Sequence, residues 1–131
     1  MGLGIWPVFK PKTGIHPQLD GKLLLDESES LDRLSSMLGV KTMTSFADNR
    51  EVPAGFDGDD DALESLLGPW EEWFDPGNAL PTFMALIAAL ERPEVAAEFE
   101  DADGLLYELR DVERCLLLAS QTGAQFRLEV L

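Results

Sequence analysis

The side chains best suited to chemistry are concentrated between residues 57 and 75, and the first of them are carboxylates. Four aspartates occur within five positions: Asp57, Asp59, Asp60 and Asp61. A calcium loop of the EF-hand type needs glycine at its sixth position and glutamate at its twelfth, where this chain has Ala62 and Gly68. We therefore predict no dedicated metal site, and weak, nonspecific Ca²⁺ or Mg²⁺ binding stays open. The run is instead typical of a solvated segment that favours the N-terminus of a following helix.

Aromatic rings follow at a spacing that is typical of a helix. Trp70, Trp73 and Phe74 fall at positions i, i+3 and i+4, which predicts a helical turn with three rings on one side. One interpretation is a turn that faces the core. The other is a contact surface, because tryptophan beside a carboxylate such as Glu71 can hold a cationic side chain. Glu71 and Asp75, four residues apart, would then act as paired acids or share a cation.

No other residues form a recognisable catalytic motif. His16 is the single histidine and Cys115 the single cysteine, so neither an internal disulfide nor a four-thiolate metal site can form. His16 lies between Ile15 and Pro17 in a Pro/Gly-rich stretch, and we expect it to be a loop residue. Cys115 falls within a helical pattern and is expected to be buried. The sequence assigns no catalytic residue and no cofactor.

Net charge limits the classes of partner. The 131 residues carry a formal charge of −15. Residues 48–75 contain ten acidic residues and one arginine, a local charge of −9. Such a field repels nucleic-acid phosphates and anionic membrane surfaces, and it speeds encounter with cationic proteins. Neither a signal peptide nor a transmembrane segment is recognisable, so we expect a cytoplasmic protein.

A second aromatic feature lies inside the acidic region. Residues 48–61 have no hydrophobic periodicity and contain Pro53, Gly55 and Gly58, which predicts an exposed loop. Phe56 is the exception in this polar segment. It either pins the loop to the body of the protein or is the apolar anchor of a contact with a partner.

Helices and strands that would position these residues follow from hydrophobic spacing. A run of β-forming residues predicts a strand at residues 3–9, and alternation of apolar and polar residues predicts one at 124–130. Two threonines and Phe46 predict a strand more weakly at residues 41–46. Helical spacing predicts helices at residues 28–38, with Ser28 as its cap, at 61–67, at 80–90 after a turn at 75–78, and at 103–122. The fold class is therefore α+β: one globular domain over residues 1–131 whose small sheet pairs the terminal strands, with about four helices packed on one face.

Two functions are compatible with these patterns. The first is a non-catalytic interaction module that binds a basic protein, as an inhibitor or immunity-type protein does, or as a mimic of nucleic-acid charge. Its partner-binding residues would be Asp57, Asp59, Asp60, Asp61, Phe56, Trp70, Glu71 and Trp73. The alternative is a small enzyme or ligand-binding protein that uses the acidic aromatic region from Trp70 to Asp75. A deep pocket with converging polar groups would favour the alternative.

Overall fold

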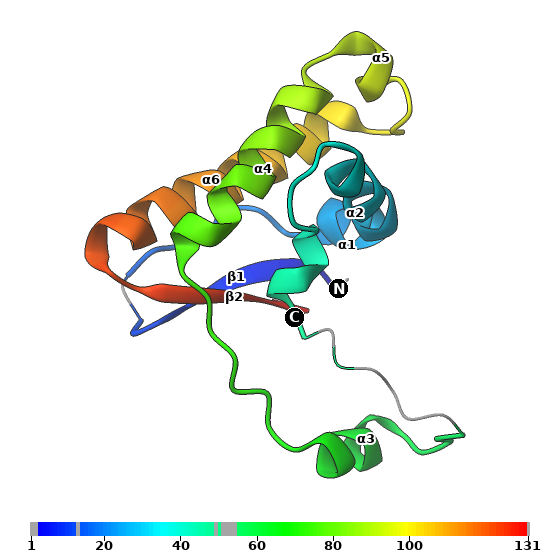
Figure 1. The fold of residues 1–131 in the computed structure, drawn as a ribbon, viewed down its shortest axis with the longest axis vertical. Coiled ribbons are helices and arrows are strands. Elements are labelled where there is room, and N and C mark those ends of the chain that lie inside the picture. Colours follow the sequence, from blue (N-terminus) through cyan, green and yellow to red (C-terminus); the bar gives the residue numbers. More distant parts are fainter. Residues whose placement is uncertain (1–2, 13, 49, 51–54, 131) are drawn as a thin grey trace.

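The two terminal strands form one antiparallel ribbon, which confirms the pairing predicted for them. The computed structural model describes residues 3–12, 14–48, 50 and 55–130 (Figure 1). Strand β1 (Ile5–Lys10) pairs with β2 (Gln125–Val130), and Phe9 lies opposite Phe126. Phe126 and Leu128 are buried, whereas the alternating residue Arg127 lies on the other face. Pro7 lies in β1, an edge strand of the two-stranded sheet, which tolerates proline because only an inner strand needs the amide that proline lacks.

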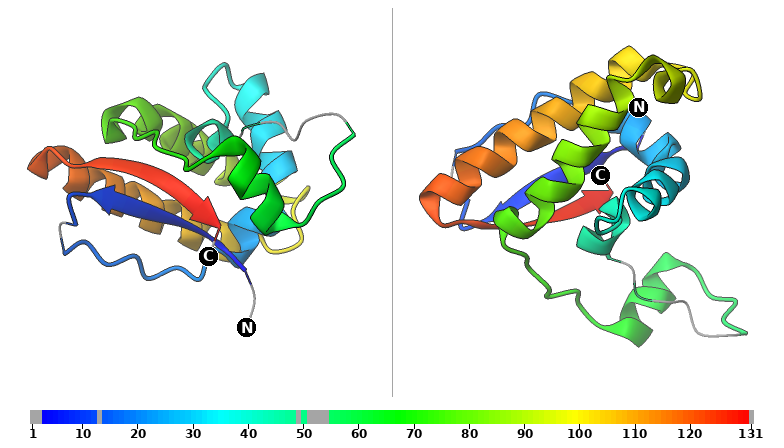
Figure 2. Two further views of the ribbon diagram at one scale, coloured as in Figure 1. Left: turned by 90° about the horizontal axis from the view of Figure 1, so that it is seen from below. Right: turned by 45° about the horizontal axis from the view of Figure 1, so that its top comes forward.

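Helices fill the chain between the two strands. They are α1 (Lys22–Asp26), α2 (Ser28–Met37), the 3₁₀ helix η1 (Met43–Phe46), α3 (Asp60–Leu67), α4 (Pro76–Leu90), α5 (Pro93–Ala96) and α6 (Ala102–Thr122). The contact between α4 and α6 is the most extensive of any pair of elements, and both helices lie across one face of the ribbon (Figure 2). The α+β class is confirmed. Within the described residues, no helix combines the length and the apolar character needed to span a lipid bilayer.

The core forms where the apolar stripe of α6 meets α4 and the ribbon. The stripe predicted for this helix is fully buried along its length: Leu105, Leu109, Val112, Leu116 and Ala119. Gly123 ends α6 in the left-handed conformation, with φ of 74°, as expected for a glycine after a helix. Helical spacing alone therefore identified the principal core helix and both of its ends.

The weak strand prediction at residues 41–46 is wrong. Residues 43–46 form η1 instead, and Phe46 is buried in the core. Asp32 of α2 explains the difference, because its carboxylate accepts hydrogen bonds from both the amide and the hydroxyl group of Thr44. This attachment draws the segment onto α2, and only Ala47 reaches the sheet, where it forms a bridge to Leu128.

Two helix starts also differ from expectation. Ser28 makes no capping hydrogen bond at the start of α2, because Glu27 occupies the position before the helix. The segment at residues 75–78 is the beginning of α4 rather than a separate turn. Asp75 accepts a hydrogen bond from the Gly77 amide at 2.8 Å, and Pro76 occupies the first helical position. An aspartate followed by proline at this position is the signal that identifies such a start.

Candidate functional site

The acidic region forms an arm, residues 48–73, whose two ends are attached to neighbouring positions of β2. At one end, Ala47 forms a parallel bridge with Leu128. At the other, Phe74 and Phe126 exchange backbone hydrogen bonds of 2.8 and 2.9 Å. Within the described chain, the arm therefore leaves and rejoins the body at one place on the sheet. Residues 49 and 51–54 of the predicted loop lie outside the described residues.

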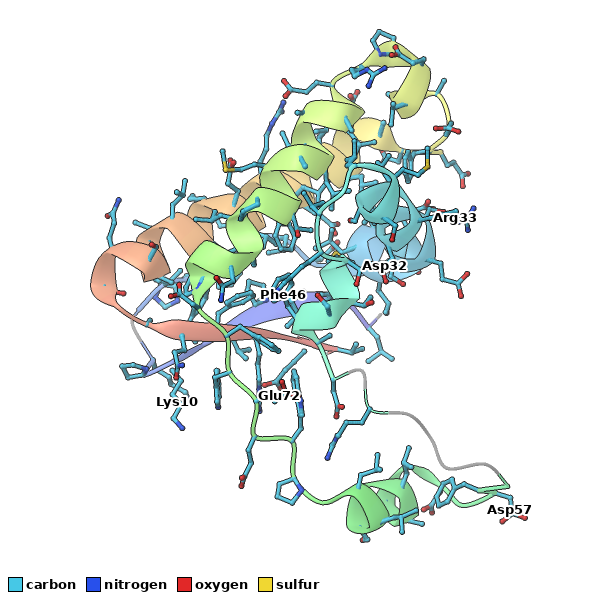
Figure 3. The ribbon with its side chains drawn as sticks, in the orientation of Figure 1. Lys10, Asp32, Arg33, Phe46, Asp57 and Glu72 are labelled. Atoms are coloured by element: carbon cyan, nitrogen blue, oxygen red, sulfur yellow. The ribbon has the colours of Figure 1, made fainter. Side chains whose placement is uncertain are left out.

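Helix α3 occupies the far part of the arm and stands off the body (Figure 1). It makes no extensive contact with any other described helix or strand. Asp59 caps it, since its carboxylate accepts a hydrogen bond from the Ala62 amide at 2.9 Å. This confirms that the aspartate run favours a helix N-terminus. Figure 3 shows Asp57 near the tip of the arm, far from Phe46 in the core.

Arg50 joins the outgoing part of the arm to the C-terminal end of α3. Its guanidinium donates hydrogen bonds to the carbonyl oxygens of Leu67 at 3.1 Å and Gly68 at 2.9 Å. The same side chain forms a 2.9 Å ion pair with Asp48, whose pKa it lowers by donating a hydrogen bond to the carboxylate. Cations are favourable at a helix C-terminus, where carbonyl groups lack partners within the helix. Arg50 thus links residue 50 to the C-terminal end of α3.

Arg127 of β2 holds the returning part of the arm. Its guanidinium carbon lies 4.7 Å from the ring centroid of Trp70 and 4.4 Å from that of Trp73. It also donates a hydrogen bond to the Trp70 carbonyl oxygen at 2.7 Å and pairs with Glu129 at 2.9 Å. The two tryptophans do bind a cation, as one interpretation of the sequence held, but here that cation belongs to the same chain.

The helical turn predicted for Trp70 to Phe74 is wrong. The backbone there is not helical, and Phe74 continues into its bridge with β2. Stacking on Arg127 and hydrogen bonding to Phe126 outweigh the weak local preference for a turn. The face that would have brought Glu71 and Asp75 together is consequently absent: Glu71 is exposed, and Asp75 caps α4.

A groove of about 530 Å³ lies between α3 and the outer edge of β2. Its apolar lining includes Leu63, Leu67, Trp70 and Leu128. Its charged side chains form two internal ion pairs, Asp48–Arg50 and Arg127–Glu129. The groove therefore lies between the arm and the body of the protein. Each charged side chain that lines it is paired with another charged side chain of the lining.

The residues proposed for partner binding fall into two groups along the arm. Asp57, Asp59 and Asp61 are exposed around the start of α3, and the side chain of Asp60 lies outside the described part of the chain. Trp70 and Trp73 are half-buried against Arg127, with exposed Glu71 between them. The structure does not gather all eight residues into one patch.

Phe56 and Leu66 are the apolar side chains of most interest outside the groove. Phe56 is half-buried beside Gly58, where an added Cβ would come within 2.8 Å of its ring. Leu66 of α3 is 58% exposed, and the sequence analysis did not name it as a candidate contact residue. It falls at i, i+3 and i+4 spacing with Leu63 and Leu67 on the eight-residue helix, and that spacing was the available signal.

Arg127→Ala is expected to lower the free energy of unfolding by about 2 kcal/mol. The variant loses the contacts with both indole rings, together worth about 1 kcal/mol, and the hydrogen bond to the Trp70 carbonyl, worth about another 1 kcal/mol. Arg127→Lys should recover only part of the loss, since an ammonium group cannot stack between two rings. Chemical denaturation and limited proteolysis of residues 55–75 measure both effects. Equal stability and equal cleavage in Arg127→Ala and the parent would contradict this account of the arm.

Cys115 is buried, as expected from its place in the helical pattern, and His16 lies in a loop. Cys115 is fully buried, and burial raises the pKa of its thiol to about 11. His16 is exposed, and its carbonyl oxygen accepts a hydrogen bond from Arg114 at 2.9 Å. Because the thiolate is the nucleophilic form, this environment opposes reactivity at neutral pH.

Comparisons with known proteins give no relative from which a function could be transferred. No family model matches the chain, and searches of curated proteins and of solved structures found no significant match. Among the side chains that the structure describes, no group of three or more His, Cys, Asp or Glu residues is arranged to hold a metal ion. The geometry of the arm is therefore the principal basis for a functional proposal.

Proposed function

We propose that the chain is a non-catalytic cytoplasmic interaction module, and that its arm binds a basic surface of another protein. The observation that carries this proposal is the arm itself: helix α3 is held away from the core, with exposed Asp57 and Asp59 just before it and exposed Asp61 in its first turn. An inhibitor or immunity-type protein, or a mimic of nucleic-acid charge, would act through such an element.

The attachments of the described part of the arm support this proposal, because a segment that is already held in place loses less conformational freedom on binding. The arm is attached at Ala47 and Phe74, and it is braced internally by Arg50 and from the body by Arg127. Preorganisation raises affinity by reducing this loss. Surplus negative charge on the arm raises the rate of encounter with a cationic surface.

Leu66 supplies an apolar contact within the acidic surface. Helix-in-groove recognition uses apolar side chains on one face of a helix, surrounded by charges that set specificity. Leu66 is 58% exposed, and exposed Asp61 belongs to the same helix. We expect the partner surface to contain an apolar depression bordered by lysine or arginine.

Replacing Asp57, Asp59, Asp60 and Asp61 together by asparagine should slow association with a cationic probe about tenfold at low salt. Asparagine retains the ability to cap α3, so the helix should remain. A suitable probe is an amphipathic lysine–leucine peptide, with an oligolysine of equal charge for comparison. Association rates are measured at about 20 and about 150 mM salt, where the Debye length falls to roughly 8 Å.

A matched variant separates the arm from overall charge. Asp26, Glu29, Glu98 and Glu100 are exposed carboxylates of the body, and neutralising them removes the same charge. This control should slow association much less than the arm variant. Leu66→Ala should weaken binding of the lysine–leucine peptide and leave oligolysine binding unchanged. If the arm and body variants lose association rate equally, binding reflects net charge alone and the proposed role of the arm is wrong.

A further inference from the structure

A second groove, of about 430 Å³, lies between α2 and the residues around α5. Helix α5 is at the end of the molecule opposite the arm (Figure 1). The apolar lining of this α2–α5 groove comes from both of its sides: Leu34, Met37 and Leu38 on one, and Val95 and Phe99 on the other. Leu34, Val95 and Phe99 are half-buried and pack on the core, so the floor of the groove belongs to the folded body.

Met37, at the rim of the groove, is an apolar side chain that the fold does not bury. It is 79% exposed, the largest fraction among the large apolar residues that the structure describes, and neighbouring Leu38 is 38% exposed. The end of α2 does not need either side chain, because Gly39 is left-handed and the Val40 amide donates to the Ser35 carbonyl at 3.1 Å. A protruding methionine beside an apolar groove is typical of a contact surface, since its flexible side chain adapts to what covers it.

Charged side chains of both signs line the same groove: Arg33, Arg92 and Glu98. Arg92 forms a 2.7 Å ion pair with Glu94. Arg33 and Glu98 are exposed, and neither side chain forms an ion pair or a hydrogen bond with another described residue. Arg33 points outward from α2, away from the core residue Phe46 (Figure 3). The groove thus has one unpaired positive charge on the side of α2 and one unpaired negative charge just after α5.

Electrostatic repulsion between two copies of the chain is not increased by this lining. The chain carries a formal charge of −15, so two copies repel each other over most of their surface. At the groove, Arg33 and Arg92 are balanced by Glu94 and Glu98. Exposed carboxylates close by in the sequence do not line the groove: Glu29, Glu91 and Glu100. The lining charges therefore cancel, whereas those of the arm do not.

We propose that the α2–α5 groove is a self-complementary interface through which two copies of the chain form a symmetric dimer. In a two-fold interface every contact occurs twice, so one face must supply both members of each contact. This face supplies a protruding methionine with an apolar groove, and an unpaired arginine with an unpaired glutamate. Met37 of each copy enters the groove of the other, and Arg33 of each pairs with the partner's Glu98. The arms lie outside the interface, so each dimer carries two of them.

Sedimentation equilibrium of the full chain tests for the dimer. The mass should rise from that of one chain toward that of two between about 10 and about 500 µM protein, the range for a small interface. The salt concentration should be about 150 mM, where the Debye length of roughly 8 Å screens the overall negative charge. A mass that stays at that of one chain throughout this range would overturn the proposal and leave the groove to another protein or to an apolar ligand.

A pair of methionine variants tests which face is used. Met37→Lys places a charge against the apolar groove and should raise the dissociation constant at least about tenfold, as the loss of a central contact does. Met84→Lys is the matched control, because Met84 of α4 is also exposed, at 54%, and lies outside the groove. Circular dichroism should show the same fold in both. A dimer that Met37→Lys leaves intact would use another face and would contradict the proposal.

Charge reversal tests the two-fold pairing itself. Arg33→Glu and Glu98→Arg each set like charges opposite one another at both contacts, so each variant alone should dimerise about tenfold more weakly. A mixture of the two variants should form mixed dimers as strongly as the parent chain, because opposite charges then meet at both contacts. The double variant should also dimerise like the parent. If the two folded variants associate no better when mixed than each does alone, the self-complementary interface is wrong.

Discussion

Removing residues 126–131 is expected to abolish folding rather than to trim an end. Phe126 and Leu128 are 0% and 1% exposed, so their apolar surface has no alternative site of burial. The Phe126 ring lies 5.7 Å from Phe46 and 6.3 Å from Phe74. Strand β2 also bonds β1 on one edge and the ends of the arm on the other. Its loss leaves backbone groups unpaired at all three places.

Circular dichroism and two-dimensional NMR measure this outcome directly. The truncated chain should show neither a cooperative thermal transition nor dispersed amide resonances. Phe126→Ala alone should cost about 3–5 kcal/mol, as deletion of a buried aromatic ring does. Val130→Ala is the control within the same strand. Val130 is 50% exposed, and its replacement should cost less than about 1 kcal/mol. A cooperative transition that survives truncation would show that β2 is dispensable to the core.

Gly21→Ala is expected to be nearly as damaging, at about 3 kcal/mol or more. Gly21 has φ of 76°, a conformation that costs other residues roughly 1–2 kcal/mol. An added Cβ would also overlap the Ile5 carbonyl oxygen, and Ile5 donates a hydrogen bond to the Gly21 carbonyl. The backbone of β1 would have to move away, because no flexible side chain is available to yield.

Gly39 provides a matched control for this effect. It has the same φ of 76°, and an added Cβ there meets no atom within 4 Å. Gly39→Ala should therefore cost only the conformational strain, roughly 1–2 kcal/mol. Chemical denaturation of both variants gives the difference, which measures the close approach of β1 to residues 20–21. Equal losses of stability would show that β1 adjusts without cost.

The helices and the terminal ribbon were accessible to sequence reasoning because their signals are local. The stripe from Leu105 to Ala119 repeats at helical spacing, and Gly123 ends that helix. The alternation of apolar and polar residues over 124–130 predicted which face of β2 is buried. Such patterns succeed because one side of each element must be apolar to form a core. The same reasoning failed at residues 41–46, where Asp32 supplied a stronger attachment than the sheet.

The candidate site was only partly predictable. Composition identified residues 48–61 as acidic and predicted them to be exposed, which the structure confirms for Asp48, Asp57, Asp59 and Asp61, and the aspartate run was correctly placed at the start of a helix. Spacing also suggested that Trp70 and Trp73 bind a cation, but it gave the wrong backbone conformation and could not name the cation. Arg127 lies 57 residues away along the chain from Trp70. No local pattern connects these residues, because their contact depends on where β2 lies in the folded protein.

By itself, the sequence determined the α+β class, the pairing of the two ends, the principal core helix and the concentration of negative charge on one segment. These properties follow from periodicity, composition and chain position, because the spacing of apolar residues within one segment determines which side of that helix or strand can be buried. The tertiary structure alone decided that the acidic segment stands off the body as a braced arm. It likewise brought the Leu24 amide to the buried carboxyl group of Glu108, 84 residues away along the chain. Burial and long-range hydrogen bonding arise only when distant elements pack, and they decide which side chains become neutral, paired or exposed.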